Sequence, residues 1–324
     1  MQKILFSLSL ILAGITCGYL LQQILRQHFA KADILLPHLR KALQRTSMLG
    51  LMPLAYIGAT WVMLLPDLRV ALLPLLGGGV IICGGMLGLL ATRLLKKSGS
   101  QKSVLFCCGA FSNIGSFGGL VSFIFFGEQG FALLVLYRLF EEILYYGVGF
   151  PVARFLSIEH AELQIVKRLL ETLRDPFFLV GSGSFLAGIL LNLSGLERPA
   201  ILDTLNNIFV PTGIFLLLVS IGLGMRFSVV RNYLIEGVTV SLIKFVALPL
   251  VAGIASWLFG LHAIQDGLPM KVALVAASMP VAFNALVVAS VYDLDLDLAN
   301  SCWLITTASL LFVLPWLYFL CTLL

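Results

Sequence analysis

Apolar residues occur in long, nearly unbroken runs, and the polar residues gather in short stretches between them. Each run approaches the ~20 residues that a helix needs to cross the hydrocarbon core of a bilayer. In lipid, only helices and closed barrels pair all their backbone polar groups, and the two-residue alternation of barrel strands is missing from these runs. The pattern therefore predicts an all-α integral membrane protein. The ten predicted transmembrane helices cover residues 4–25, 47–66, 69–95, 103–127, 130–156, 176–194, 205–226, 234–260, 269–292 and 299–322.

Composition supports this interpretation. Of the 324 residues, 60% are hydrophobic and only 11% are charged, and the mean hydropathy is +1.03. A soluble domain has about 25% charged residues. The low charge excludes a soluble enzyme, a nucleic-acid-binding protein and a disordered chain. We therefore expect a lipid bilayer around the protein and no nucleic acid as a partner.

The first apolar run could be read as a signal peptide, because Lys3 precedes it. However, no small-x-small cleavage site stands out, and the residues before Cys17 make a poor lipoprotein box. The run also continues to about residue 25. These features favour a first spanning helix.

Lysine and arginine predict the orientation. The connections after spans 1, 3, 5, 7 and 9 contain 15 of the 21 cations, whereas the two termini and the other connections contain four. Cytoplasmic connections are enriched in Lys and Arg, so both termini are expected outside. The 15 cations are Arg26, Lys31, Arg40, Lys41, Arg45, Arg93, Lys96, Lys97, Lys102, Arg154, Lys167, Arg168, Arg174, Arg226 and Arg231. The four are Lys3, Arg69, Arg198 and Lys271.

Residues 158–175 separate two halves, 1–157 and 176–324. In this segment, Val166, Leu169, Leu170 and Leu173 fall on one helical face, and the cations lie opposite. The pattern predicts a short amphipathic connector that lies on the cytoplasmic leaflet.

The two halves repeat one plan. With an offset of 166 residues, Ser112 falls on Ser278, and Asn113-Ile114 falls on Met279-Pro280. The stretches from Ser112 to Gly119 in the fourth span and from Ser278 to Asn284 in the ninth are polar and interrupted by Gly or Pro at matching places. Each half has five spans, and an odd number inverts the second half in the membrane. Inverted repeats with interrupted helices are typical of secondary transporters. The alternative is that these Gly and Ser residues only allow close helix packing.

At these residues the chain resembles the auxin efflux carrier family, which includes the plant PIN-FORMED carriers and many bacterial permeases. The resemblance rests on the runs at 112–121 and 125–133 around the fourth span and at 278–285 and 289–295 around the ninth. Lys244 before Pro249 also fits. Leu120 departs from the pattern, because the family usually has a proline there. The long central loop of many plant members is missing, so the chain resembles a permease of the bacterial inner (plasma) membrane.

The resemblance implies a ten-span carrier in which the fourth and ninth spans cross near the bilayer centre. It also implies a small organic anion as substrate, such as a mono- or dicarboxylate. Physical reasoning agrees, because interrupted helices offer unpaired amides and positive dipole ends to a carboxylate. We expect the substrate between the two interruptions. The candidate substrate-binding residues are Ser112, Asn113, Ile114, Gly115, Met279, Pro280 and Asn284.

Four charged residues lie well inside predicted spans, away from the span ends. Arg138 can reach Glu141 and Glu142 one turn away, and Lys244 could pair with one glutamate or with the substrate. Ionisable groups in lipid are costly and are functional candidates by default. Either the four form a neutralised structural network, or one glutamate exchanges a proton during transport. Neither predicted interruption contains an acidic residue, so a proton-linked carrier or a uniporter ranks above a sodium-coupled symporter of the bile-acid type.

Other functions fit less well. An intramembrane enzyme would need a nucleophile with a base, or a metal cluster, at membrane depth, and no histidine lies within a predicted span. The Asp293–Asp297 turn starts like a calcium loop, but Leu298 stands where glycine is required. Asp297 is better interpreted as the cap of the tenth span. A receptor or scaffold stays an alternative, as do a monomer and a homodimer. We expect no catalytic residue, no metal and no cofactor.

Overall fold

The computed structural model describes residues 2–29, 31–64, 67–157, 165–225 and 230–324. Within these ranges the chain is helical, and its one β contact is an isolated bridge. The α-helices are α1 (Gln2–His28), α2 (Ala32–Arg45), α3 (Met52–Trp61), α4 (Leu73–Leu94), α5 (Gly99–Ala110), α6 (Gly119–Tyr137), α7 (Phe150–Ser157), α8 (Ile165–Leu173), α9 (Pro176–Leu193), α10 (Ile201–Gly222), α11 (Leu234–Leu242), α12 (Leu248–Leu258), α13 (Leu268–Ala277), α14 (Asn284–Val291) and α15 (Leu296–Leu323).

Seven shorter segments have tighter or wider helical turns. The 3₁₀ turns are η2 (Leu68–Leu72), η5 (Val230–Tyr233) and η7 (Leu261–Ala263), and the π-helical turns are η1 (Thr46–Leu51), η3 (Ile114–Gly118), η4 (Ile143–Gly149) and η6 (Ile243–Ala247). Wide π turns inside helices are frequent at functional sites. Two of them, η3 and η6, contain residues that the sequence singles out, and η4 begins directly after Glu142.

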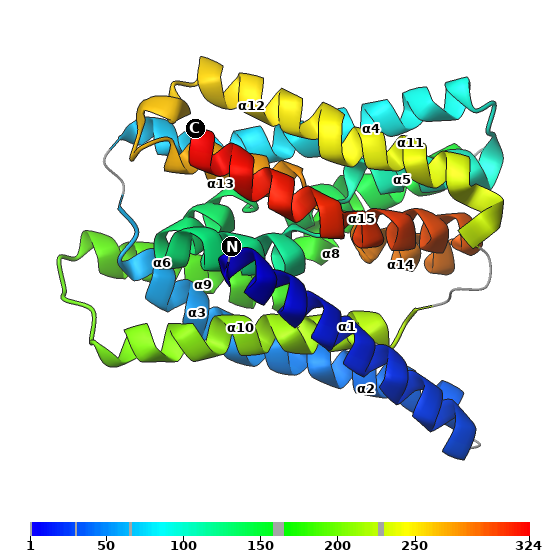
Figure 1. The fold of residues 1–324 in the computed structure, drawn as a ribbon, viewed down its shortest axis with the longest axis horizontal. Coiled ribbons are helices and arrows are strands. Elements are labelled where there is room, and N and C mark those ends of the chain that lie inside the picture. Colours follow the sequence, from blue (N-terminus) through cyan, green and yellow to red (C-terminus); the bar gives the residue numbers. More distant parts are fainter. Residues whose placement is uncertain (1, 30, 65–66, 158–164, 226–229) are drawn as a thin grey trace. The chain divides into compact units, whose positions relative to one another are not determined.

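The chain divides into two compact units. Unit 1 contains residues 1–64, 119–135 and 176–225. Its main pairs are α3 with α9 and α1 with α10, and Figure 1 shows α1 running along α10. A Cβ atom on Gly18 would clash with the carbonyl of Val219, and one on Gly222 would clash with the carbonyl of Ile15. Glycine therefore lets these two backbones approach closely, as in many transmembrane helix pairs.

Unit 2 contains residues 65–118, 136–175 and 226–324. Its most extensive pair is α4 with α5, followed by α11 with α15 and α12 with α13. Gly84 of α4 and Gly109 of α5 face each other, and a Cβ atom on either would clash with the carbonyl of the other. Helix α5 ends at Ala110, directly after this close approach, and the candidate site begins there.

Seven helices of the described chain are long and apolar enough to cross a membrane. This number is lower than the ten predicted spans because several predicted spans are interrupted. The predicted span 103–127 is split after Ala110, and the predicted span 269–292 is split after Ala277. The predicted span 130–156 starts inside α6 and continues through η4 into α7. In α6, Gly127 has a positive φ of 69° and breaks the helix between Phe126 and Glu128.

Two predicted connections contain helices. Residues 32–45, expected in the connection after the first span, form α2. In the predicted connector 158–175, α8 covers Ile165–Leu173, and residues 158–164 lie outside the described part of the chain. Leu169 of α8 packs on Gly147 of η4, whereas Val166 is 72% exposed.

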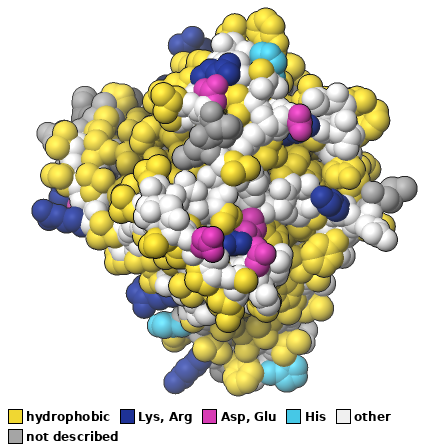
Figure 2. Space-filling model, turned by 90° about the vertical axis from the view of Figure 1, so that its left-hand side faces the viewer, with side chains coloured by type: hydrophobic (Ala, Val, Ile, Leu, Met, Phe, Trp, Pro, Cys, Tyr) yellow, Lys and Arg dark blue, Asp and Glu magenta, His cyan; other side chains and the backbone are white. Residues whose placement is uncertain are grey.

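Large apolar side chains are exposed along many helices, including α1, α4, α9, α12 and α15. On the face drawn in Figure 2, hydrophobic side chains cover most of the surface, and charged side chains form a few small groups. An apolar exterior of this extent is what a lipid environment requires. The protein is therefore an all-helical, multi-pass membrane protein in its described residues.

Candidate functional site

Two helix interruptions meet within unit 2. The first is the non-helical stretch 111–113 between α5 and η3, and the second is 278–283 between α13 and α14. They pair antiparallel, with Ser112 opposite Val281. The amide of Asn113 donates to the carbonyl of Pro280 at 2.8 Å, and the amide of Ala282 donates to the carbonyl of Phe111 at 2.9 Å. Each interruption thus satisfies backbone groups that the other leaves unpaired.

The sequence accounts for the second interruption better than for the first. Pro280 has no amide hydrogen and cannot continue the ladder of a helix. The first interruption contains no proline. Gly118 and Gly119, which precede the departure from the family pattern at Leu120, are helical, and Leu120 is fully buried. The break instead begins at Phe111, whose backbone is extended (φ −88°, ψ 116°). The helices that precede the two interruptions end at Ala110 and Ala277. These positions differ by one residue more than the 166-residue offset between the halves.

Tyr145 of η4 binds the backbone of the first interruption. The amide of Ser112 donates to the Tyr145 hydroxyl at 2.7 Å, and this hydroxyl donates to the carbonyl of Ser112 at 2.9 Å. The ring centroids of Tyr145 and Phe111 lie 4.3 Å apart. Sequence reasoning missed Tyr145. Tyr145 could have been found from its position one helical turn after Glu141, because side chains four residues apart on a helix lie side by side.

Lys244 of η6 also binds the first interruption. Its ammonium group donates to the carbonyl of Gly109 at 2.7 Å and to the hydroxyl of Ser112 at 2.8 Å, and its side chain is fully buried. The sequence left open a pairing of Lys244 with a glutamate, but Lys244 binds Gly109 and Ser112 instead. Lys244 instead places a cation at the carboxyl end of α5, where carbonyls lack partners and the helix dipole is negative.

The other three intramembrane charges form one group. Arg138 Nε lies 2.5 Å from Glu141 Oε2, and Arg138 Nη2 lies 4.0 Å from Glu142 Oε1. This group is continuous with the first interruption, because a Cβ atom on Gly115 would lie 2.6 Å from Arg138 Nη1. The guanidinium group therefore sits against the start of η3. It adds positive charge where the amides of the first turn already favour an anion.

All eleven residues singled out from the sequence lie in unit 2, but they differ in exposure. Ser112, Ile114, Met279 and Pro280 are buried. Asn113 is 8% exposed, and its side-chain oxygen accepts the amide of Ser116 at 3.4 Å. The partly exposed members are Gly115, Arg138, Glu142 and Asn284. Tyr146, which the sequence did not single out, is more exposed still and interacts with Asn284. The buried members can shape the backbone, and the exposed ones can touch a solute.

A second polar group ties together three connections of unit 2. Asp295 caps α15, and its carboxylate accepts the amide of Leu298 at 2.9 Å. The same carboxylate accepts the Gln101 amide at 2.9 Å and the Tyr233 hydroxyl at 3.1 Å. The sequence expected Asp297 as this cap, which is wrong, because Asp297 lies beyond the position whose oxygen can reach the first free amides. Glu236, which follows Tyr233 in the chain, forms an ion pair with Lys97 at 2.6 Å.

Near the other end of the unit 2 helices, Arg69 joins two connections. It binds the Asp67 carboxylate at 2.6 Å and the carbonyl of Gly260 at 3.3 Å. Its hydrogen bonds to Asp67 hold the pKa of that carboxyl below its usual range.

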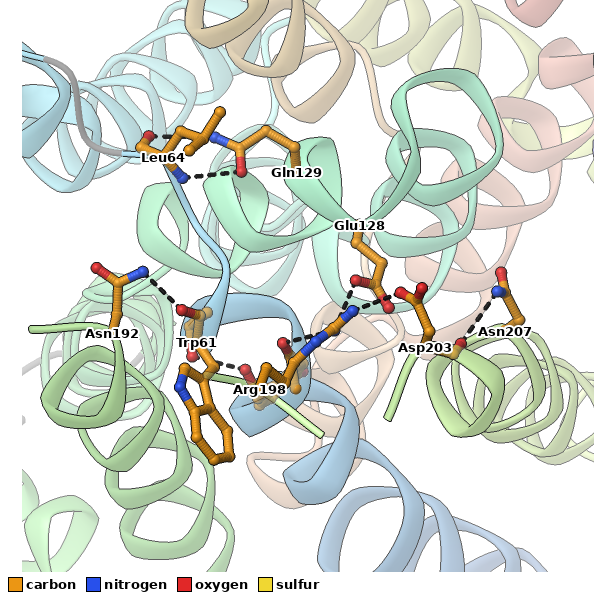
Figure 3. A network of polar contacts seen from close by, with 11 residues as sticks. Trp61, Leu64, Glu128, Gln129, Asn192, Arg198, Asp203 and Asn207 are labelled. Carbon is orange, nitrogen blue, oxygen red and sulfur yellow. Dashed lines mark hydrogen bonds and ion pairs between the residues drawn. The ribbon is translucent and has the colours of Figure 1, made fainter. Parts of the chain in front are cut away.

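Unit 1 has its own polar network, shown in Figure 3. Arg198, between α9 and α10, donates to Glu128 Oε2 at 2.7 Å and to the carbonyl of Gly58 at 3.0 Å, and it pairs with Asp203. Around it, Asn192 donates to the carbonyl of Trp61 at 2.6 Å, and Gln129 donates to the carbonyl of Leu64 at 3.1 Å. The network fastens the kink at Gly127 to the ends of α3 and α9.

Metal binding has no structural support within the described ranges, which contain no group of three His, Cys, Asp or Glu side chains able to hold an ion. All six cysteines are described with free thiols, and four of them are buried.

Paired helix interruptions inside an apolar, multi-pass helical protein are typical of membrane transporters. The chain belongs to the membrane transport protein family, whose model matches residues 30–318. This is the auxin efflux carrier family that the motifs indicated, so that resemblance is confirmed. The protein is therefore a membrane transporter of this family.

Two archaeal proteins are similar over most of the chain. An uncharacterized transporter of Methanothermobacter thermautotrophicus is 28% identical over 241 residues, which are 72% of this chain and 74% of that protein. An uncharacterized transporter of Methanocaldococcus jannaschii is 28% identical over 251 residues, which are 73% of this chain and 76% of that protein. The names of both relatives indicate transport, and neither name specifies a substrate.

Proposed function

We propose that this protein is a secondary-active permease that moves a small organic anion, such as a mono- or dicarboxylate, by alternating access. The observation that carries the proposal is the antiparallel contact between the two interrupted helices, through Ser112 and Val281. Secondary carriers bind their substrates at interruptions of this kind, where half-helix ends and open backbone face a cavity.

The charges favour an anion. Arg138 lies against Gly115 at the start of η3, and Asn284 begins α14. A carboxylate placed beside Gly115, Arg138 and Asn284 would meet a guanidinium fork and two amino-terminal helix ends. In this proposal the other candidates have a supporting role: Ser112, Asn113, Ile114, Met279 and Pro280 shape the two interruptions.

We also propose ten spans in two inverted halves, 1–157 and 176–324, with residues 158–175 as the connector. The chain passes from unit 1 to unit 2 after Leu64 and after Met225, near the end of the second span of each half, and also after Val135. Contacts between connections agree with the predicted sides. Asp295, Gln101 and Tyr233 join connections predicted inside, whereas Arg198 and Glu128 join connections predicted outside.

The proposed location is the bacterial inner (plasma) membrane, with both termini outside. The orientation rests on the distribution of Lys and Arg. Membrane-impermeant labelling of a cysteine-free variant that carries one cysteine near either terminus tests it. Labelling in intact cells is expected for both, and protection of either would contradict the orientation. The oligomeric state, monomer or homodimer, stays a prediction.

Proton linkage is the proposed form of coupling, with Glu141 as the exchanging group. Glu141 adjoins both Arg138 and Tyr145, whereas Glu142 lies 4.0 Å from Arg138 and can keep that cation paired when Glu141 is neutral. Two carboxylates beside one cation resist ionising together in a medium of low dielectric constant. Glu141→Gln should therefore abolish accumulation driven by a pH gradient but retain substrate binding. Glu142→Gln should retain coupling and lower stability.

The experiment that tests the function is counterflow of labelled mono- and dicarboxylates into proteoliposomes, with and without a pH gradient. Replacing sodium with choline separates proton linkage from the sodium-coupled alternative. Asn284→Ala should weaken substrate binding while the protein still folds, and Asn207→Ala, an exposed residue of α10 in unit 1, serves as the matched control. Counterflow of no carboxylate would contradict the substrate class, and unchanged affinity in Asn284→Ala would contradict the placement.

A further inference from the structure

The hydroxyl of Tyr145 occupies both backbone polar groups of Ser112. It accepts the amide hydrogen at 2.7 Å and donates to the carbonyl at 2.9 Å. Tyr145 is 1% exposed, so water does not compete for these contacts. A helix interruption leaves backbone groups without helical partners, and an unpaired buried group is costly. Tyr145 therefore contributes two of the hydrogen bonds that hold the first interruption, and the carbonyl of Ser112 also accepts the amide of Ile114 at 2.9 Å.

The same hydroxyl has a third neighbour, the carboxyl group of Glu141. A phenol has one hydrogen to donate and two lone pairs that accept. When Glu141 is protonated, its O–H can donate to Tyr145, and Tyr145 can donate to the carbonyl of Ser112. All three groups then have partners. When Glu141 is ionised, its carboxylate and the carbonyl of Ser112 compete for one phenolic hydrogen.

We propose, on the basis of the proposed function, that Tyr145 is a positioning residue that links the protonation state of Glu141 to the first helix interruption. With Glu141 neutral, Tyr145 binds Ser112 through both bonds and the interruption is held. With Glu141 ionised, Tyr145 donates to the carboxylate, and the carbonyl of Ser112 keeps only the hydrogen bond from the amide of Ile114 at 2.9 Å. The Ser112 hydroxyl is bound by Lys244 at 2.8 Å, so the change extends along a chain from Glu141 through Tyr145 and Ser112 to Lys244.

The groups that face Glu141 permit this exchange. Arg138 is its ion-pair partner at 2.5 Å, and Glu142, at 4.0 Å from Arg138, offers a second carboxylate to that cation. The remaining titratable neighbours are Tyr137 at the end of α6, Tyr145 and Tyr146 of η4, Lys244 of η6, which is reached through Ser112, and Asp175 after α8, which faces Glu142. Arg138 therefore has a counter-charge in both states of Glu141.

The first test is the pH profile of transport in Tyr145→Phe, which removes only the hydroxyl. The ionised carboxylate of Glu141 is less stable when it loses a charge-assisted donor. The midpoint of the pH profile of transport should therefore move by about one pH unit to higher pH. In a Glu141→Gln background the same substitution should cause no shift. Tyr56→Phe in unit 1 is the matched control and should leave the profile unchanged. An unshifted profile in Tyr145→Phe, or an equal shift with Glu141→Gln, would overturn the proposal.

The second test needs neither transport nor a foldable Tyr145 variant. Infrared difference spectra, acid minus neutral, are recorded on the purified protein with ring-deuterated tyrosine to identify the phenolic C–O band. A tyrosine band should change with pH in the wild-type protein and should be lost in Glu141→Gln. A band that persists in Glu141→Gln, or none in the wild type, would overturn the proposal. If the protein shows the Glu141-dependent band but transports no carboxylate, only the proposed function would be contradicted.

Discussion

The ammonium group of Lys244 donates a hydrogen bond of 2.8 Å to the hydroxyl of Ser112, although the two residues are 132 positions apart in the chain. The same group caps the carbonyl of Gly109 at 2.7 Å, at the end of α5. One buried cation thus binds both the last turn of α5 and the interruption that follows it. A positive charge at a carboxyl-terminal helix end is favourable, and low dielectric strengthens the effect.

Lys244→Met is expected to slow transport without unfolding the protein. Methionine has a similar length, and it removes both hydrogen bonds, each worth about 1.5–3 kcal/mol for a charged donor. Part of this loss is offset because a buried charge is removed. We expect at least ~10-fold slower uptake with a modest decrease in melting temperature. Lys271→Met, a partly exposed residue of α13, is the control for loss of one cation. Wild-type uptake in Lys244→Met would contradict the role of this residue.

Gly115→Ala is expected to weaken substrate binding. The added methyl group would lie 2.6 Å from Arg138 Nη1 and would displace the guanidinium group from the start of η3. Displacing one charge-assisted contact should weaken binding by about 10-fold. Gly79→Ala in α4 is the matched control, because nothing lies within 4 Å of its new methyl group, and it should stabilise the helix by about 0.5–1 kcal/mol. Equal affinities in the two variants would show that Arg138 does not contribute through this position.

Asp295→Ala is expected to lower the melting temperature more than Asp297→Ala. Asp295 caps α15 and accepts hydrogen bonds from Gln101 and Tyr233, so its loss should cost about 2 kcal/mol or more. Asp297 is exposed, and its side chain is not the cap. Thermal unfolding of the two purified variants, followed by a thiol-reactive dye, makes the comparison. Similar decreases in both would contradict the assignment of the cap.

Arg198→Lys is expected to destabilise unit 1. The guanidinium fork contacts Glu128, Asp203 and the carbonyl of Gly58, and a lysine ammonium cannot reproduce that geometry. Arg198 is 10% exposed, so we expect a loss of about 2–4 kcal/mol in the free energy of unfolding. Arg168→Lys is the control, since its pair with Glu171 is exposed and should be worth under about 1 kcal/mol. Protease sensitivity in detergent at increasing temperature reports the difference, and equal resistance would show that the network is not stabilising.

The candidate site was only partly visible in the sequence. Ser112, Asn113 and Pro280 were found because polar and helix-breaking residues are conspicuous inside apolar runs. Tyr145 was missed because a tyrosine in a membrane helix has no distinctive local pattern, and its partner is 33 positions away. The place of the first interruption was also missed. Gly118 and Gly119 have the composition of a break, but the pairing of Phe111 with Ala282 puts the break earlier.

The sequence by itself determined the membrane class, the helical content, the transporter family and the group of residues in which the candidate site lies. These follow from local properties: the length of apolar runs, the scarcity of charge and two short motifs. The tertiary structure decided which groups touch. It paired Ser112 with Val281, placed Lys244 on the first interruption rather than on a glutamate, and set Arg138 against Gly115. Such contacts depend on how distant helices pack, and in lipid that packing is set by close backbone approach and polar pairing, which no short stretch of sequence encodes.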